Sequence, residues 1–129
     1  GFSIGYYKIV PDEIDCIAEE LIYLSDEVKI DIVFTNGGTG FSQRDVTPEA
    51  TQKVIQKYIP GFGEVMRAKS LEITPKAMLS RAIAGIRNRT IIVNLPGSPK
   101  GAVENLEVIL PAIPHGVGIL KGQESECAR

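Results

Sequence analysis

The sequence predicts an α/β fold, because two apolar runs are each followed by a glycine-containing loop and the start of a helix. Residues 30–34 form a short, mostly apolar run that favours a strand buried on both faces. The glycine loop 37–40 (GGTG) follows, and residues 47–49 (TPE) then have the composition of a helix start. Residues 90–95 and 96–99 repeat this order, with Ser98 as a polar N-cap and Pro99 at the first helical position. In such folds, strand, loop and helix N-terminus together form anion sites at the carboxyl edge of the sheet.

Composition limits the classes of function. The 129 residues suffice for one domain, and 43% hydrophobic with 23% charged residues is ordinary for a globular protein. A net charge of −2 argues against a nucleic-acid partner. No apolar run approaches the roughly 20 residues of a membrane span, so we expect no membrane partner. Cys16 and Cys127 lie far apart, which favours reduced thiols and a cytoplasmic location. With His115 the only histidine, carboxylates, hydroxyls and backbone must carry any chemistry.

The first elements follow from proline positions and apolar spacing. We expect a strand over residues 4–10, closed by Pro11. Asp12 then has the composition of an N-cap, and apolar residues at helical spacing predict a helix that ends near Lys29. After the glycine loop, Thr47 is the expected N-cap of a helix over residues 48–59.

The remaining elements are predicted in the same way. Pro60-Gly61 should break the second helix, and residues 61–71 suggest another short one. A short helix opened by Thr74-Pro75 should reach about Ser80. Residues 82–86 and 90–95 are expected to form a hairpin around a basic turn at 87–89. The final helix, which prolines must kink or split, should end the single domain at residue 121, leaving a flexible tail over 122–129.

Three points at the ends of predicted strands should gather around one cleft. If the strands are parallel, Asp12, residues 37–47 and residues 96–100 lie along one edge of the sheet. The GGTG loop alone matches neither the Walker pattern nor GxGxxG, so a plain strand-to-helix turn remains an alternative. Arg44 and Asp45 favour a ligand site, because a plain connection needs neither.

Three motifs, in order, resemble the molybdenum cofactor biosynthesis family. They are TNGGTGFSQRDVTPEAT, SLEITPKAMLSRAIAGIR, and TIIVNLPGSPKG followed by ILPAIPH. Within that family the chain is most similar to the molybdopterin adenylyltransferases, the bacterial enzyme and the G-domains of plant and animal two-domain proteins. The resemblance runs from about Tyr7 to Leu120.

The resemblance implies a three-layer α/β/α sandwich around a mostly parallel sheet, assembled as a homotrimer. It implies transfer of AMP from ATP to the terminal phosphate of molybdopterin with Mg²⁺, releasing pyrophosphate. A molybdate-inserting partner enzyme would receive the product. Two alternatives are a non-catalytic carrier trimer that binds molybdopterin and, ranked last, a structural trimer. Family members also begin with a further strand and helix, so we expect the natural protein to carry both ahead of Gly1.

The resemblance also assigns roles to individual residues. Asp12, Asp45 and Ser80 fall on the family's catalytic positions, and the two aspartates are the implied metal ligands. The implied substrate-binding residues are Gly37, Gly38, Thr39, Gly40, Thr47, Asn94, Pro96, Gly97 and Ser98.

Three cationic residues are further candidates for the site, and the three catalytic assignments each have a structural alternative. Arg44, Arg81 and Lys100 are candidates for countering substrate charge. Asp12 is equally suited to capping a helix, Asp45 to stabilising its own loop, and Ser80 to ending a helix as an ordinary hydroxyl. His115, flanked by a proline, is expected on the surface or at an interface.

Overall fold

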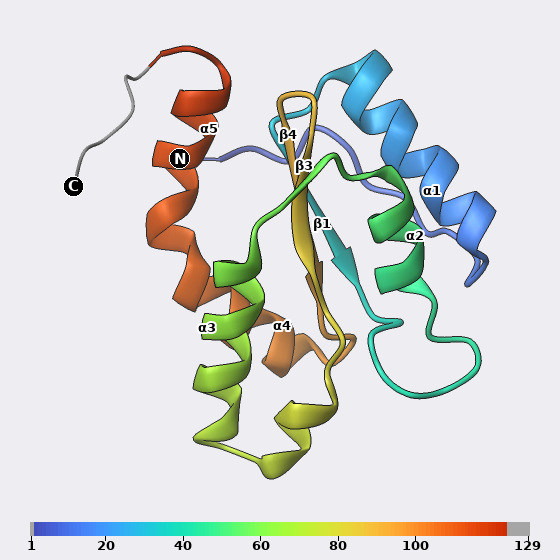
Figure 1. Ribbon diagram of the computed structural model, residues 1–129, viewed down its shortest axis with the longest axis vertical. Helices are drawn as coiled ribbons and strands as arrows, with labels where there is room; N and C mark the ends of the chain where they lie inside the picture. Colours follow the sequence, from blue (N-terminus) through green and yellow to red (C-terminus); the bar gives the residue numbers. More distant parts are fainter. Residues whose placement is uncertain (1, 124–129) are drawn as a thin grey trace.

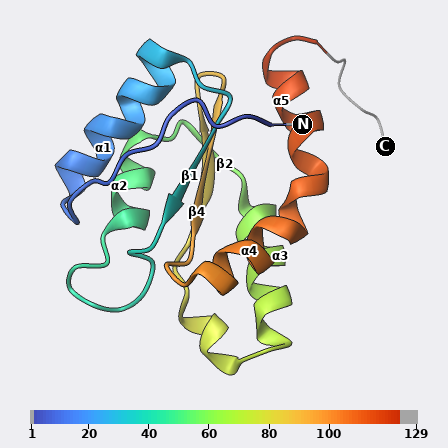
Figure 2. The same cartoon turned by 180° about the vertical axis from the view of Figure 1, so that it is seen from behind.

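The computed structural model describes residues 2–123 as three layers (Figures 1 and 2). One layer holds helices α1 (Ile14–Ile22) and α2 (Thr47–Val54). The opposite layer holds α3 (Pro60–Leu71), α4 (Pro99–Ile109) and α5 (Ile113–Leu120). A sheet lies between them, so the predicted α/β sandwich is confirmed.

The four strands of the sheet are β1 (Ile32–Asn36), β2 (Lys57–Tyr58), β3 (Ala84–Arg87) and β4 (Thr90–Leu95), in the order β1-β4-β3-β2. Strand β1 pairs in parallel with β4, from Ile32 opposite Ile91 to Asn36 opposite Leu95. The other two pairings are antiparallel, so the sheet of the described residues is mixed where a mostly parallel one was expected. The reason is the predicted hairpin, which reverses β3 against β4 and leaves β2 antiparallel to β3.

Strand β4 is buried on both faces and therefore organises the core. Ile91, Val93 and Leu95 pack with Met66 of α3 and with α4 and α5. Ile92, between them, faces α1 and α2, as the two-residue period of a strand requires. Because β1 runs parallel to β4, the GGTG loop and the 96–99 loop leave the sheet at the same edge. The predicted meeting of these two junctions is confirmed.

The predicted strand over residues 4–10 is wrong. This segment joins no sheet, and Ile4, Tyr7 and Ile9 are exposed. Its anchor is Glu20 of α1, which accepts hydrogen bonds from Tyr6 Oη (2.5 Å) and Lys8 Nζ (3.0 Å). An apolar, β-favouring sequence without a strand beside it has no partner for its backbone groups.

Helix α1 begins later than predicted, so the N-cap assignment of Asp12 is wrong. The residue flanking the helix is Glu13, in an extended conformation and without a side-chain cap. The Glu13 amide donates to the carbonyl of Pro11 (2.8 Å), and this turn leaves Asp12 one residue too early to cap. A π-helix, η1 (Tyr23–Val28), extends α1 and is followed by Lys29, near which the helix was expected to end. Lys29 takes a left-handed conformation with φ 59°.

The second helix is also shorter than predicted. Thr47 is the first helical residue and not the cap, and the helix ends at Val54 because Ile55 turns extended. The Gln56 amide then donates to the carbonyl of Ile86 (2.7 Å), which draws the following residues into β2. Pro60 does not break a helix but opens α3, since proline is tolerated in the first turn.

The later elements agree with the sequence. The 3₁₀ helix η2 (Pro75–Leu79) is capped by Thr74, whose side chain accepts from the Lys76 amide. The β3–β4 hairpin turns at Asn88, which has φ 53°. The 3₁₀ helix η3 (Leu110–Ala112) separates α4 from α5, as the prolines predicted. Gly122 and Gln123 close α5 by hydrogen bonds to Ile119 and Gly118, and residues 124–129 of the predicted tail lie outside the described residues, Cys127 among them.

One stretch of the described residues, Pro99–Leu120, is long and apolar enough to cross a membrane by length and composition alone. The expectation that no stretch would reach this length was therefore wrong. A mean over the helix tolerates scattered charges such as Glu104 and Glu107. In the structure this stretch is divided into α4, η3 and α5, and Ala102, Ile109 and Ile113 pack into the core cluster that contains β4.

Candidate functional site

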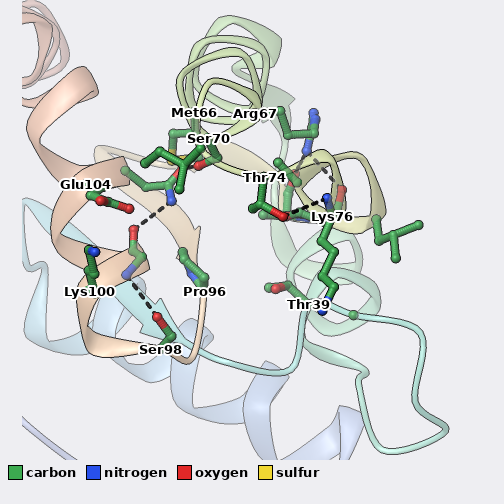
Figure 3. Close-up of a pocket in the computed structure, with 18 of the residues that line it drawn as sticks. Thr39, Met66, Arg67, Ser70, Thr74, Lys76, Pro96, Ser98, Lys100 and Glu104 are labelled. Carbon is green, nitrogen blue, oxygen red and sulfur yellow. Dashed lines mark hydrogen bonds between the residues drawn. The ribbon is translucent and has the colours of Figure 1, made fainter.

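A cavity of about 410 Å³ lies at the edge of the sheet where β4 ends. Six of the predicted site residues line it: Thr39, Gly40, Ser80, Asn94, Pro96 and Ser98. Figure 3 shows Pro96 and Ser98 on one side of the cavity, Thr39 on another, and Met66 and Ser70 of α3 closing it from above. The site is therefore built from two loops, two helices and η2.

Close backbone packing explains the glycines of the first loop. Gly38 has φ +70°, and a Cβ there would lie 2.3 Å from the Thr47 Oγ1 atom. The Gly38 carbonyl also accepts a hydrogen bond from the Thr47 amide (3.2 Å). Gly37 has φ +91°, and a Cβ there would lie 3.6 Å from the Cα atom of Gly97. The glycines thus place the loop against both the start of α2 and the second loop, although Gly37, Gly38, Thr47 and Gly97 do not line the cavity.

Asp45 stabilises its own loop. Its Oδ2 atom accepts from the Ser42 amide (2.9 Å), and its amide donates to the Ser42 carbonyl (2.9 Å). A Cβ on Gly40 would lie 2.9 Å from the same Oδ2 atom, so the carboxylate rests against a residue that lines the cavity. The structure therefore contains the loop-stabilising contact that was the structural alternative for Asp45. This contact places the carboxylate beside the cavity wall.

Ser80 and Asn94 differ in the burial of their side chains and in the hydrogen bonds that these side chains make. Ser80 is half-buried, and its Oγ atom accepts from the Ala82 amide (3.3 Å). Asn94 is fully buried, and its Nδ2 atom donates to the hydroxyls of Thr35 and Thr51 (3.0 Å each) while Oδ1 accepts from the Ile83 amide (3.1 Å). Asn94 thus joins β4 to β1, α2 and the start of β3, and holds the floor of the cavity in place.

Helix α4 directs its N-terminus at the cavity. Ser98 is its N-cap, as predicted, and its Oγ atom accepts from the Gly101 amide (2.9 Å). Three cationic side chains also line the cavity, from Arg67, Lys76 and Lys100, against one carboxylate, from Glu104. A helix N-terminus with an excess of positive side chains suits an anionic ligand.

Asp12 does not line the cavity. It is exposed and precedes α1, whose start lies toward the end of the molecule that carries the glycine loop (Figures 1 and 2). Within residues 2–123, no group of three or more His, Cys, Asp or Glu side chains is placed to hold a metal ion. The two predicted aspartates therefore belong to no such group, and two carboxylates suit Mg²⁺ only where phosphate oxygens complete the coordination.

Apart from Lys100, the half of the cavity formed by α3 and α4 was not predicted. It includes Met66, Arg67, Ser70 and Asn105. Asn105 is buried, its Nδ2 atom donates to the Gly101 carbonyl (2.7 Å), and its Oδ1 atom accepts from Ser70 Oγ (3.5 Å). A signal for it exists in the sequence, because an amide at this position interrupts the apolar face of the final helix. For Arg67 we find no comparable signal, since arginine on a helix is ordinarily solvated.

Comparisons with known proteins agree with this geometry. Residues 1–115 match the family model described as a probable molybdopterin binding domain. A molybdopterin adenylyltransferase of Helicobacter pylori is 56% identical over 91% of the chain. Gephyrin of Dictyostelium discoideum is 49% identical over 93% of the chain. The chain spans only 66% and 17% of these two relatives.

A solved structure extends the likeness to three dimensions. The molybdopterin biosynthesis enzyme MoaB of Thermus thermophilus superimposes with a TM-score of 0.89 at 46% identity, covering 97% of the chain and 79% of its own. The model match alone covers most of the sequence, including both loops of the cavity. The chain therefore belongs to the molybdenum cofactor biosynthesis family of molybdopterin-binding domains.

Proposed function

We propose that the chain is a molybdopterin adenylyltransferase. In this reaction an oxygen of the terminal phosphate of molybdopterin attacks the α-phosphorus of ATP. The bond from that phosphorus to the bridging oxygen of the β-phosphate breaks, and pyrophosphate leaves. The observation that supports the proposal best is the cavity itself, where the N-terminus of α4 and the side chains of Arg67, Lys76 and Lys100 surround a space sized for a small anionic ligand.

Transfer of a nucleotidyl group depends on positioning and on neutralising phosphate charge. In our proposal the cationic side chains hold the phosphates. The Ser80 hydroxyl donates a hydrogen bond to a phosphate oxygen, while its Oγ atom still accepts the hydrogen bond from the Ala82 amide. Asp12 and Asp45 would hold Mg²⁺ that arrives with ATP, and the ion when bound would neutralise phosphate charge. Asn94 supports the floor of the site, and the glycine loop brings backbone amides close to the ligand.

The test is release of pyrophosphate from ATP and Mg²⁺, with and without molybdopterin. We expect release that requires molybdopterin and that falls by at least about 100-fold in Asp45→Asn. The melting temperature of this variant should change little, because the Asn side-chain oxygen can still accept from the Ser42 amide. The matched control is Asp15→Asn, an exposed aspartate of α1 paired with Lys53 and not lining the cavity, which should keep the wild-type rate.

One observation supports a second candidate, a carrier that binds molybdopterin without adenylating it. Asp12 lies outside the cavity lining and Asp45 is committed to its loop, so neither carboxylate is seen directed into the cavity. Binding of molybdopterin with no release of pyrophosphate would favour the carrier. Release in Asp45→Asn at the wild-type rate would remove that residue from the proposed mechanism.

We also propose that the protein works as a homotrimer in the cytoplasm and passes its product to a molybdate-inserting enzyme. The family resemblance supports this assembly, and light scattering at the exit of a sizing column tests it. A mass near three times 14.0 kDa would agree with the proposal, and a monomer at micromolar concentration would contradict it.

A further inference from the structure

Arg81 joins three parts of the site without lining the cavity. It follows Ser80, in the segment between η2 and β3, and its backbone amide donates to the carbonyl of Thr39 (2.9 Å). Its guanidinium donates from Nε to the carbonyl of Gly40 (2.8 Å) and from Nη2 to the carbonyl of Asp45 (2.6 Å). The third nitrogen, Nη1, pairs with the carboxylate of Glu49 in the first turn of α2.

These contacts fix both ends of one loop to one side chain. Gly40 and Asp45 bound the exposed residues 41–44, and inside the loop the Asp45 carboxylate and amide are paired with Ser42. The loop is therefore closed on itself by Asp45 and attached to the rest of the site by Arg81. Thr39, Gly40 and Ser80 all line the cavity, whereas Arg81 does not.

We propose that Arg81 is a positioning residue, which sets the glycine loop and the Asp45 carboxylate at a fixed distance from Ser80. This inference rests on the proposed function for its kinetic consequences. It differs from the expectation that Arg81 counters substrate charge, because all three of its nitrogen atoms already donate to the loop and to α2. A planar guanidinium with diverging donors can hold three acceptors at once, and an ammonium group cannot reproduce that geometry.

The experiment compares Arg81→Lys with a matched control, Arg87→Lys. Arg87 uses its guanidinium in the same way, donating to both oxygens of Asp26 and to the carbonyl of Val54, but it lies at the other end of the sheet and does not line the cavity. Both substitutions keep the positive charge and remove the planar guanidinium with its diverging donors. A loss that follows from stability alone should therefore appear in both variants.

For Arg81→Lys we expect kcat for pyrophosphate release to fall about 100-fold while KM for ATP changes by less than about threefold, since misplaced groups cost rate more than ground-state binding. Amides of residues 39–46 should exchange with deuterium about tenfold faster than in the wild type, because the loop has lost its attachment. Free guanidinium ion should restore part of kcat in Arg81→Ala. The Arg87→Lys control should keep kcat, KM and the exchange of residues 39–46.

Two results would overturn the inference. A rise in KM for ATP with unchanged kcat would show that Arg81 binds the substrate directly. Unchanged exchange of residues 39–46 in Arg81→Lys would show that the loop does not depend on it. The exchange measurement needs no turnover, so a wild-type chain that releases no pyrophosphate would contradict the proposed function while leaving the role of Arg81 to be decided by exchange.

Discussion

Among single residues away from the cavity, Arg87 joins three elements of the fold. It ends β3, and its guanidinium donates to both carboxylate oxygens of Asp26 (3.1 and 2.9 Å) and to the carbonyl of Val54 (2.9 Å). Asn88 adds a hydrogen bond from Nδ2 to the same carboxylate (2.6 Å). The π-helix, α2 and the hairpin are thereby held at one point.

These contacts predict how stability depends on acid. The hydrogen bond from Arg87 is the largest effect and lowers the pKa of Asp26 below its usual 3.8. Burial opposes it, and the guanidinium charge and the Asn88 hydrogen bond lower the pKa by smaller amounts. Since the folded-state pKa lies below the unfolded value, the carboxylate stabilises the fold fully above about pH 3.8. That contribution is lost as the pH falls through the folded-state pKa.

Urea unfolding of the wild type and Asp26→Asn across a pH series measures this contribution. We expect a difference in unfolding free energy that is constant from about pH 5 to 7 and that shrinks as the pH falls below the ordinary aspartate value. The control is Asp15→Asn, whose exposed pair with Lys53 should contribute little at any pH. A difference that does not depend on pH would show that the Asp26 charge is not the source of the stabilisation.

At the scale of elements, the start of α4 serves both the fold and the site. The Ser98 hydroxyl caps the helix and also lines the cavity. A substitution that keeps the cap but changes the charge separates the two roles, because aspartate caps helices about as well as serine.

For Ser98→Asp we expect an unfolding free energy within about 0.5 kcal/mol of the wild type, since the carboxylate can accept from the Gly101 amide. Affinity for ATP in titration calorimetry should fall about tenfold or more, because a negative charge now faces the phosphates. Ser98→Ala should give the opposite pattern, losing about 1 kcal/mol of stability with a smaller change in affinity. Equal affinity in the wild type and Ser98→Asp would place the phosphates away from this helix.

Elements determined by local sequence were predicted well. Thr74 and Ser98 cap their helices as expected and the hairpin turns at Asn88, because each of these features depends on a few neighbouring residues. The two loop junctions meet through the parallel pairing of β1 with β4, which the repeated strand, loop and helix order predicted. The strand expected over residues 4–10 was wrong because strand formation depends on a pairing partner distant in sequence. Pro60 was misassigned for a related reason, since a proline that ends one helix and a proline that opens the next look alike.

In the candidate site, too, residues within local motifs were predicted and residues placed by long-range packing were missed. Its loop residues and Ser80 were found from motifs, and six of them line the cavity. Apart from Lys100, the wall formed by α3 and α4 was missed, because it depends on how two helices far apart in sequence pack against each other on one face of the sheet. Arg81 was recognised as a cation near the site, but only the three-dimensional contacts show that it holds the loop.

At the scale of the whole molecule, β4 is shared by two hydrophobic clusters. Ile92 belongs to the cluster with α1 and α2, and its neighbour Val93 to the cluster with α3, α4 and α5. Both side chains are fully buried. Loss of the strand would therefore expose both clusters together, which predicts cooperative unfolding of the two helical layers.

Ile92→Val tests this cooperativity. Removing one buried methyl group should cost about 1 kcal/mol. Native-state hydrogen exchange should report the same loss for the most protected amides of both helical layers, although the substitution touches only one cluster. Val103→Ala, at an exposed position of α4, should leave both layers unchanged. A loss confined to α1 and α2 would show that the layers unfold independently.

The contact between Gly37 and Gly97 has a consequence for regulation. At this point two loops meet through their backbones, with φ +91° at Gly37 and a distance of only 3.3 Å from a Cβ placed on Gly97 to the Cα atom of Gly37. Peptide groups do not gain or lose protons at ordinary pH, and they carry no side chain that could be oxidised or modified. Any control of ligand binding through acidity must therefore act on the ligand's own phosphates or on the side chains around the meeting point, while the junction of the loops stays chemically constant.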